Sequence, residues 1–282
     1  MKTQFPQPPL DLAMPETVQY IAALAVALPA LALLVAGFVT LRRKGTAVPL
    51  LFLVGCGIST INEPIMDELC LVWHHGLGQA TAFETFSRPI PLWVPFSYVA
   101  YFGGLTWLLF KFLRRSPTPR QVWLGVVSIF ALNLVLELPI LALDMFTYYG
   151  DQPYRIAGFP APQAFINGGG VLLSVVLLCA VPQLFAGRRR WGILLLPTGT
   201  QLAATVMTAF PIVAMGHTRL PAGLRWGGAT VSILLGVIVF DGLIRYLCAR
   251  VAAAQQLAIR DGHSQRAIAD QADRQELQWE MT

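Results

Sequence analysis

Long apolar stretches separated by short basic clusters constrain this chain more than any other feature. A helix needs roughly 17 to 25 apolar residues to cross the hydrocarbon core of a bilayer. The sequence of 282 residues contains seven stretches of that length. They lie at residues 18–41, 46–62, 92–113, 122–143, 164–185, 191–215 and 226–248. We therefore expect an all-α, polytopic bundle of seven transmembrane helices, in a multi-pass protein of the cell membrane.

The composition agrees with a membrane protein. Hydrophobic residues make up 55% of the chain and charged residues 12%, whereas a soluble domain has about 25% charged residues. The net charge of +5 comes from basic residues that flank the apolar stretches, where such residues set the orientation in the bilayer. We therefore expect the lipid bilayer as a partner and no nucleic acid.

The basic clusters occur after every second apolar stretch, at residues 42–44, 111–120, 188–190 and 245–250. Cytoplasmic loops carry the excess of Lys and Arg in membrane proteins. This pattern predicts that the N-terminus lies outside and the C-terminus in the cytoplasm, as seven spans require. The chain then divides into a polar N-terminal segment (1–17), a transmembrane domain (18–250) and a polar cytoplasmic tail (251–282), which we expect to be helical.

Carboxylates interrupt two of the apolar stretches. Glu63 and Asp67 are four residues apart and share one side of the second span if its helix continues past the intervening proline. Asn133, Glu137 and Asp144 have spacings of four and seven, which also favour one side of a helix. Acids within membrane segments face the interior of the bundle or a wet cavity. We therefore expect both sets of side chains to line one pocket.

The depth of these groups supports a shared pocket. Glu63 and Glu137 each lie seventeen residues beyond the cytoplasmic start of their span, at Thr46 and Arg120, or roughly 25 Å across at the helical rise. Asn167 lies a few residues into the fifth span, which enters from the outside. All three side chains are therefore expected at a similar level, in a pocket that opens outward.

Two long outer loops, rich in aromatic and hydrogen-bonding side chains, are expected to cover this pocket. They connect the second span to the third and the fourth span to the fifth. The candidate catalytic residues are Glu63, Glu137, Asp67 and Asp144. The candidate substrate-binding residues are Asn62, Trp93, Asn133, Tyr148, Tyr149, Gln163 and Asn167.

These residue types suit acid–base chemistry on a lipophilic substrate. Burial disfavours the charged form of a carboxyl group, and a neutral Glu in an apolar pocket is a competent acid near neutral pH. A second, ionised carboxylate accepts a proton or stabilises a cation, and aromatic faces also stabilise cations. The sequence thus indicates a cyclase or dehydratase with Glu63 and Glu137 as the acid–base pair and no cofactor.

No metal site is expected. The four cysteines form no C-x-x-C pair. The adjacent His74 and His75 point apart on a helix and lack a ligand four residues on, so we expect both at the membrane interface. The Gly168–Gly170 run is a weak phosphate-binding signal and is more typical of close helix packing.

The same residues also suit other functions. Glu63 and Glu137 can be structural groups that bond across helices or pair with Arg88 or Arg155. Carboxylates in a bundle also serve proton-coupled transporters, and a small-molecule receptor is a further alternative. A retinal-binding protein is excluded, because the last span has no lysine for a Schiff base.

The segments EPIMDELCLVWHHGLGQATAFETFSRPIPLWV and ELPILALDMFTYYGDQPYRIAGFPAPQAFING carry a family resemblance. Between residues 63 and 168 the chain resembles the actinobacterial multi-pass proteins grouped with the AveC-type spirocyclases. That resemblance implies polyketide spiroketal formation or dehydration. The overall plan is also similar to the integral-membrane terpene cyclases of meroterpenoid pathways, which implies protonation of a prenyl epoxide or alkene by buried acids.

Overall fold

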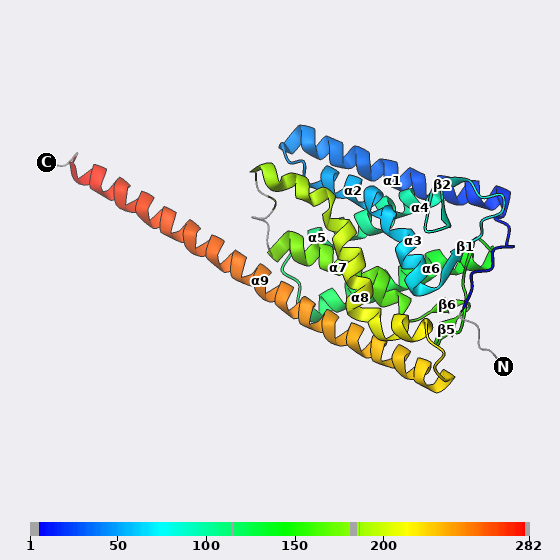
Figure 1. Ribbon diagram of the computed structural model, residues 1–282. Helices are drawn as coiled ribbons and strands as arrows, with labels where there is room; N and C mark the ends of the chain where they lie inside the picture. Colours follow the sequence, from blue (N-terminus) through cyan, green and yellow to red (C-terminus); the bar gives the residue numbers. More distant parts are fainter. Residues whose placement is uncertain (1–5, 114, 181–184, 186, 280–282) are drawn as a thin grey trace.

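Helices form most of the computed structural model (Figure 1), which describes residues 6–113, 115–180, 185 and 187–279, with side chains as far as Leu257. The α-helices are α1 (Glu16–Lys44), α2 (Val48–Ile58), α3 (Glu63–Cys70), α4 (Trp93–Tyr98), α5 (Gly104–Leu113), α6 (Pro119–Ala142), α7 (Gln163–Ala180), α8 (Leu196–Gly216) and α9 (Ala222–Trp279). Other helical segments are the 3-10 segments η1 (Ser59–Asn62) and η4 (Gly187–Leu194) and the π segment η2 (Val99–Gly103).

Within the described chain, 6 helical segments are long and apolar enough to cross a membrane. They are Glu16–Lys44, Val48–Cys70, Trp93–Leu113, Pro119–Ala142, Leu196–Gly216 and Ala222–Leu257. The fifth predicted stretch corresponds to α7, whose apolar part Gln163–Cys179 is shorter than these six segments. The predicted stretch ends at residue 185, and residues 181–184 and 186 lie outside the described residues. The helices fit a polytopic membrane protein. A seventh span and the orientation of the chain in the membrane stay predictions.

The second and third spans are each assembled from consecutive helical segments. In the second span, α2, η1 and α3 follow one another without a break, and Pro64 occupies the first turn of α3. At that position the missing N–H of proline is harmless, so the helix continues past Pro64, which is the condition under which Glu63 and Asp67 share one side. In the third span the π segment η2 joins α4 to α5, and such widened turns often occur at functional sites.

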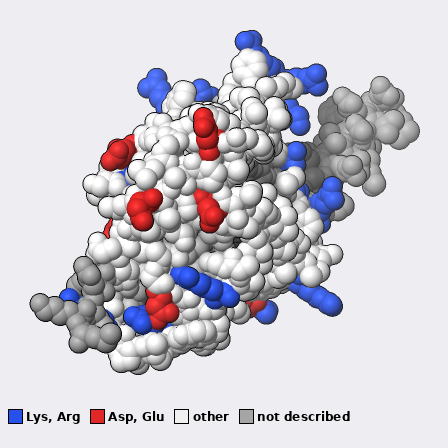
Figure 2. Space-filling model, turned by 90° about the vertical axis from the view of Figure 1, so that its right-hand side faces the viewer, with Lys and Arg blue, Asp and Glu red and all other residues white. Residues whose placement is uncertain are grey.

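The two long outer loops form strands, which the sequence analysis did not predict. Strand β1 (Val72–His74) pairs antiparallel with β4 (Phe146–Tyr148), so that the two loops are joined. The other pairs are β2 (Thr81–Thr85) with β3 (Arg88–Pro91) and β5 (Arg155–Ile156) with β6 (Phe159–Pro160). The strands gather at one end of the bundle (Figure 1), and Figure 2 shows acidic side chains on the face at this end.

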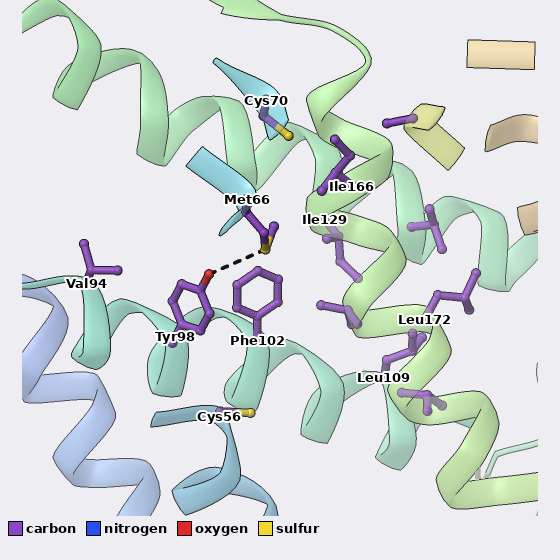
Figure 3. Close-up of a cluster of buried hydrophobic side chains, with 14 of the residues drawn as sticks. Cys56, Met66, Cys70, Val94, Tyr98, Phe102, Leu109, Ile129, Ile166 and Leu172 are labelled. Carbon is purple, nitrogen blue, oxygen red and sulfur yellow. Dashed lines mark hydrogen bonds between the residues drawn. The ribbon is translucent and has the colours of Figure 1, made fainter. Parts of the chain in front are cut away.

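The interior of the bundle combines large apolar side chains with glycines at helix contacts. Figure 3 shows Tyr98 and Phe102 directed toward Met66 of α3, with the Tyr98 hydroxyl 3.9 Å from the Met66 sulfur. Helix α7 packs against α8 and α9. A Cβ atom on Gly169 would lie 2.9 Å from Cβ of Ala204 on α8. The glycine run therefore permits close helix packing, as expected from the sequence.

The C-terminal helix α9 passes through the expected boundary at residue 250 and continues to Trp279. Its last part projects away from the bundle (Figure 1). Within the bundle, Asp241 accepts hydrogen bonds from Arg245, four residues on, and from the Trp123 indole.

Candidate functional site

A cavity of about 360 Å³ lies among α1, α3, α4, η2, α6, the start of α7, and strands β1 and β4. Its volume falls within the range of small-molecule sites, roughly 300–1,000 Å³. Most of its lining is apolar, and its polar groups come from seven separate elements. The predicted site residues that line it are Glu63, Asp67, Trp93, Asn133, Glu137, Tyr148, Gln163 and Asn167. The structure thus brings together side chains from the second to fifth predicted spans and from both outer loops.

Glu137 of α6 is held by three hydrogen-bond donors. The side-chain amides of Asn133 and Asn167 donate to Oε1 over 2.5 and 2.8 Å, and the Tyr148 hydroxyl donates to Oε2 over 2.9 Å. The Asn133 amide oxygen accepts in turn from Asn167 and from the Tyr101 hydroxyl. Donors on both oxygens suit an ionised carboxylate, and they fix the direction in which Glu137 faces the cavity.

Glu63 of α3 belongs to a second polar group. The Tyr98 hydroxyl donates a hydrogen bond to its Oε2. His74 Nε2 lies 4.0 Å from Glu63 Oε1, and His74 Nδ1 lies 3.2 Å from Asp67 Oδ2. The sequence placed Glu63 and Asp67 on one side of a helix, and the structure confirms that geometry. It also adds an imidazole that lies between the two carboxylates.

His74 and His75 do not lie on a helix, as the sequence analysis expected, because His74 ends strand β1 and His75 follows it; their level relative to the membrane interface stays a prediction. Both side chains are buried, because β1 pairs with β4 and draws them under the outer loops. His75 does not line the cavity, whereas His74 does. Burial lowers the pKa of His74, but the charge and hydrogen bond of Asp67 and the charge of Glu63 raise it more, so its net pKa lies above the ordinary 6.5.

We expect His74 to make stability depend on pH. Because the folded pKa is raised, protonated His74 contributes stability that is complete below the unfolded value of about 6.5 and is lost as pH rises through the folded pKa. The margin of wild type over His74→Phe, measured by thermal unfolding in detergent, should shrink as pH rises from about 6 to about 9. An equal margin at every pH would contradict this assignment.

Glu63, Asp67 and His74 also have the geometry of a metal site. Their ligand atoms lie within 4.8 Å of one another. Two carboxylates and an imidazole suit a divalent transition metal if the metal replaces the proton that His74 shares with Asp67. The expectation of no metal and no cofactor stays a prediction, which metal analysis of the purified protein tests.

Three predicted residues lie away from the cavity. Helix α6 ends at Ala142, and Asp144 follows in a left-handed conformation (φ 54°) with an exposed side chain. The expectation that Asp144 shares a helix face with Glu137 is therefore wrong, because α6 ends before the seven-residue spacing from Glu137 to Asp144 is complete. Asn62 is buried against α8, where its side-chain amide donates to the Thr198 carbonyl over 2.8 Å. Tyr149 is buried in the contacts around Arg88.

Arg88 of β3 holds the strands in place above the cavity. Its guanidinium donates to the Val72 carbonyl over 2.7 Å, to the Tyr149 hydroxyl over 2.8 Å and to the Glu68 carboxylate. Among the described side chains, Arg88 pairs with Glu68, and Arg155 donates to the Tyr148 carbonyl. The structural alternative, in which these arginines pair with Glu63 or Glu137, is therefore not the arrangement observed.

We expect Arg88→Gln to destabilise the protein by about 1–3 kcal/mol, because the buried Val72 carbonyl and Tyr149 hydroxyl lose their donor. Arg245→Gln is the matched control, because Arg245 is exposed and, among the described residues, forms its ion pair with its neighbour Asp241 on α9. Denaturant unfolding of both variants measures the difference. Equal stability of the two variants would contradict the role given to Arg88.

Tyr98 and Tyr101 are site residues that the sequence analysis missed. They lie three residues apart at the π segment. The Tyr98 hydroxyl donates to Glu63, and the Tyr101 hydroxyl donates to Asn133. Hydroxyls in an otherwise apolar span are the signal that was available in the sequence.

Compared with protein-family models, curated proteins and solved structures, the chain shows no match. The candidate site therefore depends on its own geometry and chemistry.

Proposed function

We propose that this protein is a cofactor-independent, integral-membrane cyclase or dehydratase that acts on a lipophilic polyketide or terpenoid substrate. One observation carries the proposal. Two carboxylates, Glu63 and Glu137, line the same largely apolar cavity, and each is hydrogen-bonded by a tyrosine hydroxyl. Ionisable groups within membrane segments are functional in most cases, and a pair in different surroundings suits acid and base roles.

The surroundings of the two carboxylates assign their roles. Glu137, which accepts three hydrogen bonds, acts as the ionised base. Glu63, which accepts one hydrogen bond from Tyr98 and lies beside the carboxylate of Asp67, acts as the acid. Glu63 gives a proton to a hydroxyl, epoxide or carbonyl oxygen of the substrate, and Glu137 takes one from the substrate. Because one proton is given and one taken, the product is an isomer of the substrate or lacks one water.

Other cavity residues exclude water and stabilise positive charge. The rings of Trp93, Phe102, Phe146 and Tyr148 line the cavity, and aromatic faces attract a developing cation. Asp67 orients His74 through a hydrogen bond of 3.2 Å, and His74 Nε2 then lies 4.0 Å from Glu63 Oε1. This division of roles is of the kind implied by the resemblance to AveC-type spirocyclases and membrane terpene cyclases.

The proposed topology has seven spans, with α7 as the fifth. The end of the bundle that carries the strands, here called the strand end, faces outward. Basic clusters lie in the last turn of α1 and at the start of η4, at the end of the bundle remote from the strands (Figure 1). Cytoplasmic loops carry such clusters. The cavity then lies in the outer half of the membrane. Because both carboxylates lie in one cavity instead of along a path, we favour conversion over proton-coupled transport.

The test is expression in a lipid-rich host that is fed linear prenyl epoxides or dihydroxy-ketone polyketides. Organic extracts are compared by mass spectrometry for wild type and Glu63→Gln. We expect a product that is isomeric with a fed compound or one water lighter, and that is missing from the variant. Identical extracts from equally well-expressed proteins would reject the proposal.

A further inference from the structure

We infer that the cavity opens sideways into the bilayer between α1 and α6, and that its substrate enters through this opening from the lipid. The inference deepens the proposed function, because it requires a substrate that is dissolved in the membrane. The opening is called the lateral portal and is formed by Ala25 and Pro29 of α1 and by Leu132 and Leu136 of α6.

The exposure of the lining residues locates the portal. Among the residues that line the cavity, those classed as exposed are Ala25, Pro29, Leu132 and Leu136. Leu132 and Leu136 are 38% and 45% exposed although they line a cavity. All four belong to α1 and α6, whose main neighbours are other elements: α2, α4 and η2 for α1, and α7 and α9 for α6. The side of the cavity between these two helices is therefore open.

The strand end of the cavity is closed. Val72, His74, Phe146 and Tyr148 line the cavity from β1 and β4, and all four side chains are buried. The N-terminal segment adds a further layer, because the backbone N–H of Met14 donates to the carbonyl of Leu77 over 2.8 Å. This finding differs from the outward-opening pocket that the sequence led us to expect.

The portal lies at the depth of lipid chains. Its residues are 9 to 13 positions from the start of α1 and 6 to 10 from the end of α6, or roughly 9–20 Å from the strand end at 1.5 Å per residue. The surrounding surface is apolar, with Leu28 and Val135 each 66% exposed. A polar solute would have to cross hydrocarbon to arrive there. The occupant is therefore an elongated apolar molecule that places an oxygen-bearing end near Glu63 and Glu137.

A photo-crosslinking experiment tests the portal without relying on conversion. A diazirine-bearing long-chain alcohol is added to the wild-type protein in lipid nanodiscs, irradiated, and mapped by peptide mass spectrometry. We expect labels on cavity residues such as Met66 and Leu105. Ala25→Trp or Leu136→Trp, which place a large ring in the portal, should reduce cavity labelling at least about fivefold.

Matched controls place the same ring on the same helices outside the cavity lining. Leu28→Trp on α1 and Val135→Trp on α6 should leave cavity labelling unchanged, and the thermal unfolding of all four variants checks that each is folded. Equal cavity labelling in portal and control variants, or labels confined to outer lipid-facing residues, would overturn the inference. A labelled cavity in a protein that forms no product would instead reject the proposed function and leave the portal standing.

Discussion

Glu63→Gln and Glu137→Gln are each expected to lower the rate of conversion by about 10²- to 10⁴-fold, the range contributed by a positioned acid or base. Glutamine keeps the size of the side chain and its ability to accept the tyrosine hydrogen bond, but it can neither give nor take the required proton. In Glu137→Gln the amide group also meets the donors of Asn133 and Asn167. The rate is measured as product formed per folded protein in detergent or nanodiscs.

Glu84→Gln is the matched control for both variants, because Glu84 is exposed on the β2–β3 hairpin. Its activity should equal that of wild type. Size-exclusion profiles and thermal unfolding establish that all three variants remain folded. Wild-type turnover in both Glu63→Gln and Glu137→Gln would contradict the catalytic roles given to these residues.

Gly169→Leu is expected to have the largest effect on stability, about 3 kcal/mol, because overpacking a close helix contact forces the backbones apart. A Cβ atom at this position already lies 2.9 Å from Cβ of Ala204, and the Phe240 ring lies 3.5 Å away on α9. Displacing α7 would also move Asn167 from Glu137. The free energy of unfolding and the yield of folded protein measure the effect.

Gly199→Leu provides the comparison for Gly169→Leu. Gly199 is also helical, on α8, and a Cβ atom there meets nothing within 4 Å. The control should therefore fold with a yield close to that of wild type. Equal stability of the two leucine variants would contradict the claim that close α7–α8 packing positions the site.

Local patterns in the sequence predicted the helices and the two key carboxylates. Apolar stretches are long and unambiguous in a membrane protein, and the spacing of Glu63 and Asp67 predicts a common helix face. The common face of Glu137 and Asp144 failed, because the sequence did not show that α6 ends at Ala142. Helix ends are set by local capping and tertiary contacts, which apolar periodicity does not reveal.

Long-range strand pairing was the part that sequence patterns could not predict. His74 joins the site because β1 pairs with β4, more than 70 positions further along the chain. The burial of Arg88 depends on the same arrangement. Tyr98 and Tyr101 were missed for another reason: aromatic residues near helix ends are usually interfacial anchors, and only the packing of α4 and η2 against α3 and α6 shows their hydroxyl partners.

The most direct test of the central claim, that this cavity performs acid–base conversion, is incubation of the purified protein in nanodiscs with the prenyl epoxides and dihydroxy-ketones proposed above. Nanodiscs enclose no compartment, so a transporter leaves the added compound unchanged. We predict that wild type forms an isomer or a product one water lighter, whereas Glu137→Gln does not. Unchanged compound with folded wild-type protein and a labelled cavity would contradict the claim.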